Sequence, residues 1–407
     1  MTPRRDVTLL FCARIVRLFC YGFLSVVLAL YLAETGFGEK QIGLLFTLTL
    51  AGDAGISLWL TTRADRFGRK RTLLLGALLM LGAGVVFVLT NNVIVLMAAA
   101  IIGVISPSGN EIGPFLSVEQ AGLTEILPNE RRTHTFAWYN LVGSFATATG
   151  ALSGGWLAAG LQAGGSSELE AYRVVLMGYA FGGFLLVLLF LGLSGRIEVE
   201  TGKESALGHR VLGLHRSRGV VFKLSALFAL DAFAGGMIVQ SMVAYWFHVR
   251  FEVDSGLLGS VFFGANVLAG VSALLAVTLA RSIGLINTMI FTHIPSNILL
   301  ILVPLMPALP LAIGLLLLRY SISQMDVPTR QSYTMAVVAA DERSAASGVT
   351  AIARSVGASL SPALTGLLFS MPALFDVPFF LAGGLKIAYD LLLFKDFRSV
   401  KPPEEND

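Results

Sequence analysis

The stretch TTRADRFGRKR (residues 61–71) lies between two strongly apolar segments, and the interpretation of the whole chain begins with it. It combines five basic residues with one aspartate and one glycine in eleven positions. Glycine permits a tight reversal of the backbone, and arginine and lysine collect in the cytoplasmic loops of membrane proteins. The stretch therefore predicts a cytoplasmic turn between two membrane-spanning helices.

Composition places the rest of the chain in a membrane as well. Of its 407 residues, 55% are hydrophobic and 14% are charged, whereas soluble domains carry about 25% charged residues. A spanning helix needs about 20 mostly apolar residues, and twelve segments of the chain meet this requirement. They lie near residues 7–32, 41–62, 72–90, 93–126, 133–161, 172–194, 220–248, 255–280, 286–306, 310–339, 343–371 and 375–395.

One long polar stretch separates the first six segments from the last six. We therefore expect an N-terminal six-helix bundle over residues 1–194, a cytoplasmic linker over residues 195–219, and a C-terminal six-helix bundle with a short cytoplasmic tail over residues 220–407. The two halves also share a pattern, since residues of the first half recur in the second at offsets of 212 to 214. The matched pairs are Pro114 with Pro328, Glu130 with Glu342, and Gly143 with Gly357. Such weak internal symmetry is typical of transporters built from two repeats.

The basic residues also predict orientation. They gather in the loops on the side of both termini, so the positive-inside rule places both termini in the cytoplasm. The N-terminal MTPRRDV is followed by a long apolar segment without a small-residue cleavage site, which indicates a first spanning helix rather than a signal peptide. We expect a multi-pass, monomeric protein surrounded by lipid in the inner (plasma) membrane of a bacterium.

The turn between the second and third segments resembles that of a known family. Asp65, Arg66, Gly68, Arg69 and Lys70 reproduce the D-R-x-G-R-K core that marks this loop in the major facilitator superfamily. The chain resembles that superfamily over essentially its whole length, in segment count, linker, repeat and motif. The resemblance implies an all-α membrane protein with twelve transmembrane helices in two pseudo-symmetric six-helix bundles.

A basic turn explains the arginines of this motif but not the aspartate among them. The Asp65 carboxylate can pair with Arg69 or accept hydrogen bonds from a neighbouring helix N-terminus. We therefore interpret Asp65, Arg66, Gly68 and Arg69 as a conformational latch that opens when the halves move. The family's usual glycine four residues before the aspartate is Thr61 here.

A second resemblance lies at TGALSGG (residues 149–155). Proton-driven exporters of the superfamily often carry G-P-x-x-G-G at this place, and here Ala151 replaces the proline. Small residues at three- and four-residue spacing are also what helix packing in lipid requires. We favour packing as the explanation and draw from the match only a slight preference for export.

Charged residues at membrane depth are the strongest functional signal. A charge near the bilayer centre costs at least ~2.5–3.5 kcal/mol, so it should face a partner or a cavity. Asp326 and Arg330 lie four residues apart near the middle of the tenth segment, with Pro328 between them. The fourth segment carries Glu111 within SPSGNEIGP, followed by Glu119. Prolines and glycines interrupt both helices where transporters place binding sites.

Arg17 in the first segment and Asp231 in the seventh complete the pattern, because the first, fourth, seventh and tenth helices line the central cavity of the superfamily that this chain resembles. A purely structural alternative pairs Arg17 with Glu111, Asp326 with Arg330, and Asp231 with Arg354. The candidate residues for substrate and proton binding are Arg17, Glu111, Glu119, Asp231, Gln324, Asp326 and Arg330, supported by the buried charges Arg14, Asp53 and Arg354.

Other polar residues are interpreted as structural. His293, Ser296 and Asn297 fall on the ninth helix, which is peripheral in the superfamily, so we expect them to be satisfied locally. Lys386 and Asp390 are expected to form a pair whose charges reach the membrane surface. The sequence offers no nucleotide-binding loop, metal-ligand cluster or nucleophile with a base, so we expect no enzyme activity, no cofactor, no metal and no nucleic acid partner.

The leading functional hypothesis is a secondary active transporter that moves a small solute by alternating access, coupled to protons, with export slightly preferred. Glu111 and Asp326 are the carboxylates expected to titrate, because burial raises a carboxyl pKa and a nearby arginine lowers it. One alternative is an organic or inorganic anion transporter with Arg17 and Arg330 as a clamp. Another is a membrane receptor or assembly partner that transports nothing.

Overall fold

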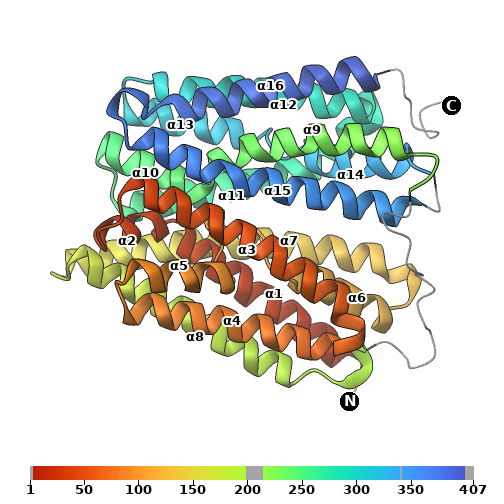
Figure 1. The fold of residues 1–407 in the computed structure, drawn as a ribbon, viewed down its shortest axis with the longest axis horizontal. Helices are drawn as coiled ribbons and strands as arrows, with labels where there is room; N and C mark the ends of the chain where they lie inside the picture. Colours follow the sequence, from red (N-terminus) through yellow and green to blue (C-terminus); the bar gives the residue numbers. More distant parts are fainter. Residues whose placement is uncertain (1–2, 199–213, 340–341, 399–407) are drawn as a thin grey trace. The chain divides into compact units, whose positions relative to one another are not determined.

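The computed structural model describes residues 3–198, 214–339 and 342–398, and every regular element in these ranges is a helix (Figure 1). Nine helices in this described part are long and apolar enough to cross a membrane. Two shorter apolar helices lie at Val93–Ile102 and Leu309–Tyr320. The protein is therefore an integral membrane protein that crosses the bilayer several times, and the expected all-α membrane fold is confirmed.

The chain forms two compact units. Unit 1 takes the described residues of Met1–Ser205 together with Val239–Phe263. Its helices are α1 (Pro3–Ser25), α2 (Leu28–Glu34), α3 (Glu39–Phe67), α4 (Arg69–Leu89), α5 (Val93–Ile102), α6 (Phe115–Ile126), α7 (Asn129–Ala163), α8 (Glu168–Leu191), the 3-10 turn η1 (Gly195–Ile197) and α10 (Gln240–Phe251).

Unit 2 takes the described residues of Ala206–Ile238 and Gly264–Asp407. Helix α11 (Ser255–Ile283) begins in unit 1 and continues into unit 2. The other elements of unit 2 are α9 (Arg218–Met237), α12 (Leu285–Leu302), η2 (Val303–Leu305), α13 (Leu309–Tyr320), α14 (Asp326–Ala336), α15 (Arg343–Phe369), η4 (Pro372–Leu374) and α16 (Val377–Phe397).

The two units repeat one packing pattern. In unit 1, α1 packs against α7 and α8, and α4 packs against α8; in unit 2, α9 packs against α15 and α16, and α12 packs against α16. Gly22 and Gly236, which are 214 residues apart, allow equivalent close approaches. A Cβ atom at Gly22 would lie 2.0 Å from the Thr147 carbonyl oxygen, and one at Gly236 would lie 2.4 Å from that of Ala358. The internal symmetry expected from the sequence is thus present in the packing.

Four of the predicted segments are each formed by two helices rather than one. The fourth segment is broken between α5 and α6, at the predicted prolines and glycines, and the tenth is broken between α13 and α14 at residues 321–325, with Pro328 in the first turn of α14. The first is also broken between α1 and α2, and the seventh between α9 and α10. These four segments carry the seven candidate residues for substrate and proton binding, whereas the supporting charges Asp53 and Arg354 lie on α3 and α15. A broken helix exposes backbone groups that other residues or a ligand must satisfy.

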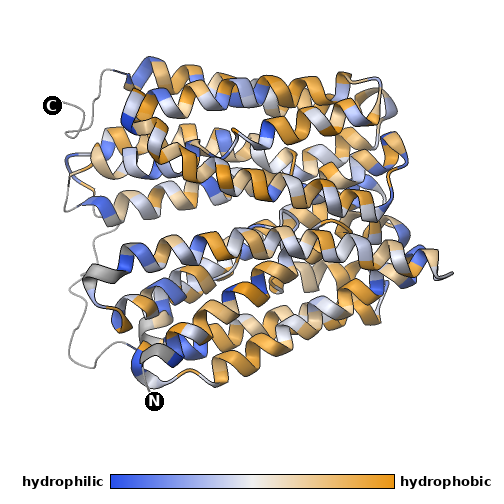
Figure 2. Ribbon diagram, turned by 180° about the vertical axis from the view of Figure 1, so that it is seen from behind, coloured by the Kyte–Doolittle hydropathy of each residue, from blue (hydrophilic) through white to orange (hydrophobic). Residues whose placement is uncertain are grey.

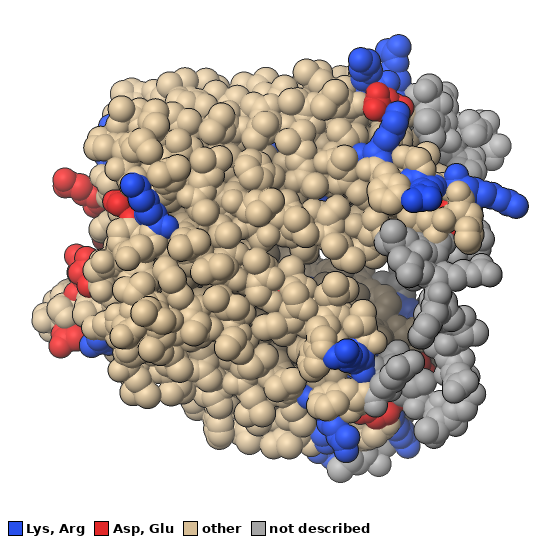
Figure 3. All heavy atoms as spheres, viewed as in Figure 1, with Lys and Arg blue, Asp and Glu red and all other residues tan. Residues whose placement is uncertain are grey.

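Apolar side chains cover the helix surfaces, as a bilayer requires. Leu89 and Ile94 are each 78% exposed and Phe291 is 62% exposed. The long helices of each unit are predominantly hydrophobic along their middle parts (Figure 2). In the view of Figure 3, the Lys, Arg, Asp and Glu side chains on the surface gather at the ends of the helices.

Candidate functional site

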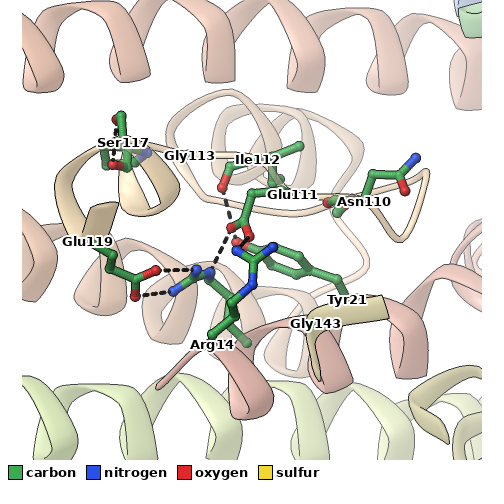
Figure 4. Close-up of polar contacts among 12 residues, drawn as sticks. Arg14, Tyr21, Asn110, Glu111, Ile112, Gly113, Ser117, Glu119 and Gly143 are labelled. Carbon is green, nitrogen blue, oxygen red and sulfur yellow. Dashed lines mark hydrogen bonds and ion pairs between the residues drawn. The ribbon is translucent and has the colours of Figure 1, made fainter. Parts of the chain in front are cut away.

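A cluster of four charged side chains lies inside unit 1. Arg17 of α1 donates from Nη1 and Nη2 to the two carboxylate oxygens of Glu119 at 2.6 and 2.7 Å, and from Nε to Glu111 at 2.8 Å. Arg14, one turn earlier, donates to the other oxygen of Glu111 at 2.7 Å. Figure 4 shows Glu111 and Glu119 directed toward this group of side chains. Two positive and two negative charges are therefore matched.

Arg17 is already paired with two carboxylates and is shielded from solvent. Its side chain is fully buried, as is that of Glu119. The hydroxyl of Tyr139 also donates to Glu119, and the Arg17 guanidinium stacks over the ring of Phe115 at 4.5 Å. Only Glu111 remains partly accessible, with 15% of its side chain exposed. A bidentate, desolvated pair of this kind fixes α1 to α6.

The break of the fourth predicted helix is held from two sides. Asp53 of α3 accepts a hydrogen bond from the Gly113 amide at 2.7 Å and one from Ser57 at 3.2 Å. From α10, the Ser241 hydroxyl contacts the carbonyl oxygen of Pro107 at 2.7 Å. Gly113 has a φ of 81°, which favours glycine. Asp53 thus positions the break that presents Glu111.

Unit 2 contains a second cluster, centred on a carboxylate. Asp231 of α9 is bonded to Lys386 of α16 at 2.6 Å, to Arg330 of α14 at 3.0 Å and to Arg354 of α15 at 3.2 Å. Arg330 also donates to Asp326 at 2.9 Å, across the turn that contains Pro328. One buried carboxylate therefore connects four helices. The side chain of Arg354 is 36% exposed, whereas those of the other residues of this cluster are at most 9% exposed.

Two sequence interpretations are wrong here. Lys386 and Asp390 do not extend to the membrane surface: Lys386 is 7% exposed and bonded to Asp231, and Asp390 is 1% exposed. His293 is not satisfied locally, because its Nδ1 lies 2.9 Å from Asp390 and its Nε2 lies 4.0 Å from Asp231. Asn297 donates to Asp390 at 3.3 Å. The packing of α12 against α16 turns these residues toward the interior of the unit.

The remaining candidates have separate positions. Gln324 lies in the turn between α13 and α14, where its backbone amide contacts the Ser272 hydroxyl at 3.4 Å. Within the described residues, no contact joins its side chain to either cluster. The three pairs of the structural alternative, Arg17–Glu111, Asp326–Arg330 and Asp231–Arg354, are all formed. Each belongs to a larger network than the pair alone.

The structure describes part of the basic turn at residues 61–71. Gly68 has a φ of 102° and joins α3 directly to α4. Glu198 accepts hydrogen bonds from the amides of Arg69 and Lys70 at 2.7 and 3.1 Å, and Arg69 donates to the Ile197 carbonyl at 3.0 Å. The side chains of Asp65 and Arg66, on which the latch hypothesis depends, lie outside the part that the structure describes. Sequence reasoning missed Glu198 because nothing fixed its distance from the turn.

The glycines of TGALSGG pack helices together, as predicted. A Cβ atom at Gly150 or Gly154 would lie 2.0 or 2.1 Å from carbonyl oxygens of α1, those of Phe19 and Phe23. At Gly155 it would lie 2.2 Å from the Ser255 carbonyl oxygen at the start of α11. These close approaches leave no room for side chains.

Two helical units of matching packing, with ions buried beside breaks in membrane-spanning helices, define a multi-pass membrane protein of the transporter class. A family model described as the Major Facilitator Superfamily matches residues 10–362. An uncharacterized membrane protein of Saccharomyces cerevisiae, YJR124C, is 31% identical over 418 residues, covering 96% of this chain and 93% of the yeast protein. The chain belongs to the Major Facilitator Superfamily.

Solved structures share the fold at lower identity. The nucleoside transporter NupG superposes with a TM-score of 0.75 at 14% identity, covering 96% of this chain and 99% of NupG. A D-xylose-proton symporter superposes with a TM-score of 0.72 at 14% identity, covering 96% of this chain and 97% of the symporter. Family and fold together indicate a membrane transporter rather than an enzyme.

Proposed function

We propose that this protein is a secondary active transporter that moves a small solute by alternating access and couples that movement to protons. The main observation in support is the unit 2 cluster, in which His293 lies between Asp390 and the Asp231 network. Ion pairs that only join helices would add little stability, because replacing buried charges with apolar side chains is often neutral or stabilising. Charges kept at membrane depth are the usual sign of an ion or substrate pathway.

The geometry favours His293 and Asp390 as the proton-binding pair. Glu111 and Asp326, the carboxylates expected from the sequence, each accept hydrogen bonds from arginines, which keep their charge at all relevant pH values. Asp390 instead has His293 and Asn297 as its hydrogen-bond partners in the described part of the chain. Histidine is the side chain whose unperturbed charge changes between pH 5 and 8. A proton can therefore enter or leave this pair without breaking an arginine pair.

The anion clamp of Arg17 and Arg330 receives less support. Three of the five N–H donors of the Arg17 guanidinium are bonded to Glu111 and Glu119, and the side chain is fully buried. An anion at Arg17 would have to displace a carboxylate that is already desolvated.

We propose that both termini and the basic turn at residues 61–71 face the cytoplasm, and that this turn acts as a latch. The bonds from Arg69 and Lys70 to Glu198 and Ile197 support a fastening at this point. Asp65→Asn should then lower turnover while folding and membrane insertion stay nearly intact, and wild-type turnover would reduce the motif to a topology signal. We propose export as the direction of transport, because residues 149–155 resemble the exporter motif.

Reconstituted vesicles test the proposal. Purified protein is placed in liposomes that contain a pH-sensitive dye, and a gradient of a nucleoside, D-xylose or an organic anion is imposed in turn. At least one solute should move protons, with the sign of the pH change giving symport or antiport. His293→Gln and Asp390→Asn should abolish the proton signal, while His134→Gln, which alters an exposed histidine of unit 1, should not. A receptor or assembly partner would show no solute flux and no response to a pH gradient.

A further inference from the structure

Arg319 is a buried charge that neither ion cluster uses. It lies in the last turn of α13, about 15 Å along the helix from Leu309 at 1.5 Å per residue. In a bilayer with a hydrocarbon core of about 30 Å, this distance places it near the middle. Ala312, Leu316, Arg319 and Ser323 are all buried and follow each other at helical spacing, so Arg319 faces the protein rather than lipid.

No acid neutralises this arginine. Among the residues that the structure describes, no carboxylate lies within 4.0 Å of the Arg319 guanidinium, and its buried Nε has no hydrogen-bond partner. The one interaction described for the guanidinium is with the ring of Tyr320, whose centroid lies 5.1 Å from the guanidinium carbon. The side chain is 9% exposed.

The neighbouring ion cluster cannot supply the missing charge. Its three carboxylates belong to Asp231, Asp326 and Asp390, and its three permanent cations are Arg330, Arg354 and Lys386. Three negative and three positive charges already balance, so the cluster has no carboxylate left over for Arg319. At membrane depth an unpaired charge of this kind is costly, which favours a functional reason for its presence.

A second unsatisfied group lies one turn further along the same face. The Ser323 hydroxyl is buried, with the residue 6% exposed, and has no hydrogen-bond partner. Ser323 belongs to the turn that separates α13 from α14, beside the contact between the Gln324 amide and Ser272. A guanidinium and a hydroxyl left without partners at a break in a spanning helix form a donor set that fits an oxyanion.

We propose that Arg319 and Ser323 bind an oxyanion group, a carboxylate or a phosphate, carried by the transported solute. This inference rests on the proposed transport function and adds the chemical class of the solute to it. The planar guanidinium matches two oxygens of a carboxylate or phosphate, and the serine hydroxyl donates to one of them. The solute supplies the negative charge that Arg319 lacks as a partner, so a neutral analogue would leave Arg319 unpaired.

Binding is tested on the purified full-length protein by thermal unfolding at constant ionic strength. The probes are inorganic phosphate and acetate, with chloride as the reference anion. We expect phosphate or acetate to raise the midpoint of unfolding of the wild type above its value in chloride, and the response identifies which oxyanion is preferred. Arg319→Gln should lose at least nine-tenths of that rise. Arg281→Gln, which removes an exposed arginine from the same unit, should keep it.

The unliganded variants separate binding from a structural role. Because Arg319→Gln removes an uncompensated charge, its midpoint without probe should equal or exceed that of the wild type. A lower midpoint together with an undiminished response to phosphate and acetate would overturn the proposal, as would a wild type that responds to neither anion. Oxyanion binding without solute flux in vesicles would contradict the proposed transport function but not the oxyanion site. Flux of a neutral solute without oxyanion binding would contradict the oxyanion site at Arg319 but not the transport function.

Discussion

The ion clusters of units 1 and 2 occupy equivalent places in the repeat but have opposite polarity. Arg17 on α1 and Asp231 on α9 are 214 residues apart, and each pairs with more than one opposite charge in its cluster. Arg17 is held by carboxylates of a single chain segment, Glu111 and Glu119. Asp231 is held by Lys386, Arg330 and Arg354, which come from three different helices. A repeat can therefore preserve the position of a buried ion while its sign and its connections change.

This difference predicts different tasks for the two clusters. The unit 1 cluster consists of two arginines and two glutamates in matched pairs, and it fastens the broken fourth segment to α1. The unit 2 cluster adds a histidine, His293, next to Asp390, and histidine is the side-chain type most often used to bind and release protons. We infer that unit 1 supplies a stable support and unit 2 a responsive one. Each prediction below tests this contrast.

The largest effect on stability should follow Asp231→Asn. The substitution leaves Lys386, Arg354 and part of the Arg330 network without their shared carboxylate in a buried place. Removing one partner of a buried ion pair costs about 3–5 kcal/mol, and here three cations lose a partner together, so we expect a loss at or above that range. Thermal or chemical unfolding of the detergent-purified protein measures it.

Asp396→Asn is the matched control for that substitution. Asp396 lies on α16 in the same unit but is exposed, and its contact with Lys223 spans 3.8 Å. Exposed pairs contribute about 0–1 kcal/mol, so the control should remain close to the wild type. Equal stability of the two variants would show that Asp231 is solvated rather than the buried centre of the cluster.

A smaller but still large loss should follow Arg17→Gln in unit 1. The change strands Glu119, which is fully buried, while the partly accessible Glu111 keeps its bond to Arg14. We expect a loss of about 3 kcal/mol, the lower end of the range for breaking a buried pair. Adding Glu119→Gln should recover much of this loss, since the stranded charge disappears. If the double variant is no more stable than the single one, the support described for unit 1 does not depend on this pair.

Much of this architecture could be predicted from the sequence. Apolar length gives the spanning segments, proline and glycine mark the break at Glu111, and Pro328 lies just after the break that precedes Asp326. The break between α1 and α2 is not visible because residues 25–28, SVVL, contain neither glycine nor proline. It depends on contacts that form only in the fold, such as those of Gln240 and Ser241 with Ser25.

The composition of the unit 2 cluster was the least predictable part of the site. Lys386, Asp390 and His293 carry ordinary signals for helix ends and kinks, and counting along a helix gives depth but not the face that packs inward. That face is decided by the contacts of α12 and α9 with α16. The role of Arg319 could not be predicted for the same reason. A single arginine at the end of an apolar run resembles an interfacial residue until the buried face of its helix is known.

A moderate effect, dependent on pH, should follow Glu342→Gln in unit 2. The Glu342 carboxylate accepts hydrogen bonds from the backbone amides of His215, Arg216 and Ser217, just before α9 begins. These amides lower the pKa of Glu342 from 4.5 to about 2. A carboxylate whose pKa is lowered by folding stabilises the folded state at pH values above its unfolded-state pKa. This stabilisation is lost as the pH falls through the folded-state pKa. Wild type should therefore exceed Glu342→Gln in stability at pH 7, and the difference should shrink between about pH 4 and pH 2.

Glu198 offers the corresponding comparison in unit 1. It accepts two backbone amides at the start of α4, one fewer than Glu342 accepts. Glu198→Gln should therefore cost less stability at pH 7 than Glu342→Gln. Unfolding midpoints of both variants measured from pH 7 downward give the comparison, and a larger cost at Glu198 would contradict the count of amide bonds as the cause.

The smallest effect on stability, and a large one on transport, should come from changing Asp326 and Arg330 together. Arg330→Gln alone strands Asp326, whose described ion partner is Arg330. Asp326→Asn alone leaves Arg330 bonded to Asp231, so it should be the milder of the two single changes. The double variant removes one charge of each sign and leaves Asp231 with Lys386 and Arg354. Its unfolding midpoint should lie near that of the wild type, because the cluster stays neutral.

If α14 responds to the proton taken up by His293 and Asp390, this stable variant should nevertheless lose solute-driven proton movement in vesicles. A double variant that transports at the wild-type rate would mean that the pair only balances charge, and the responsive part of unit 2 would then be restricted to Asp231, His293, Lys386 and Asp390.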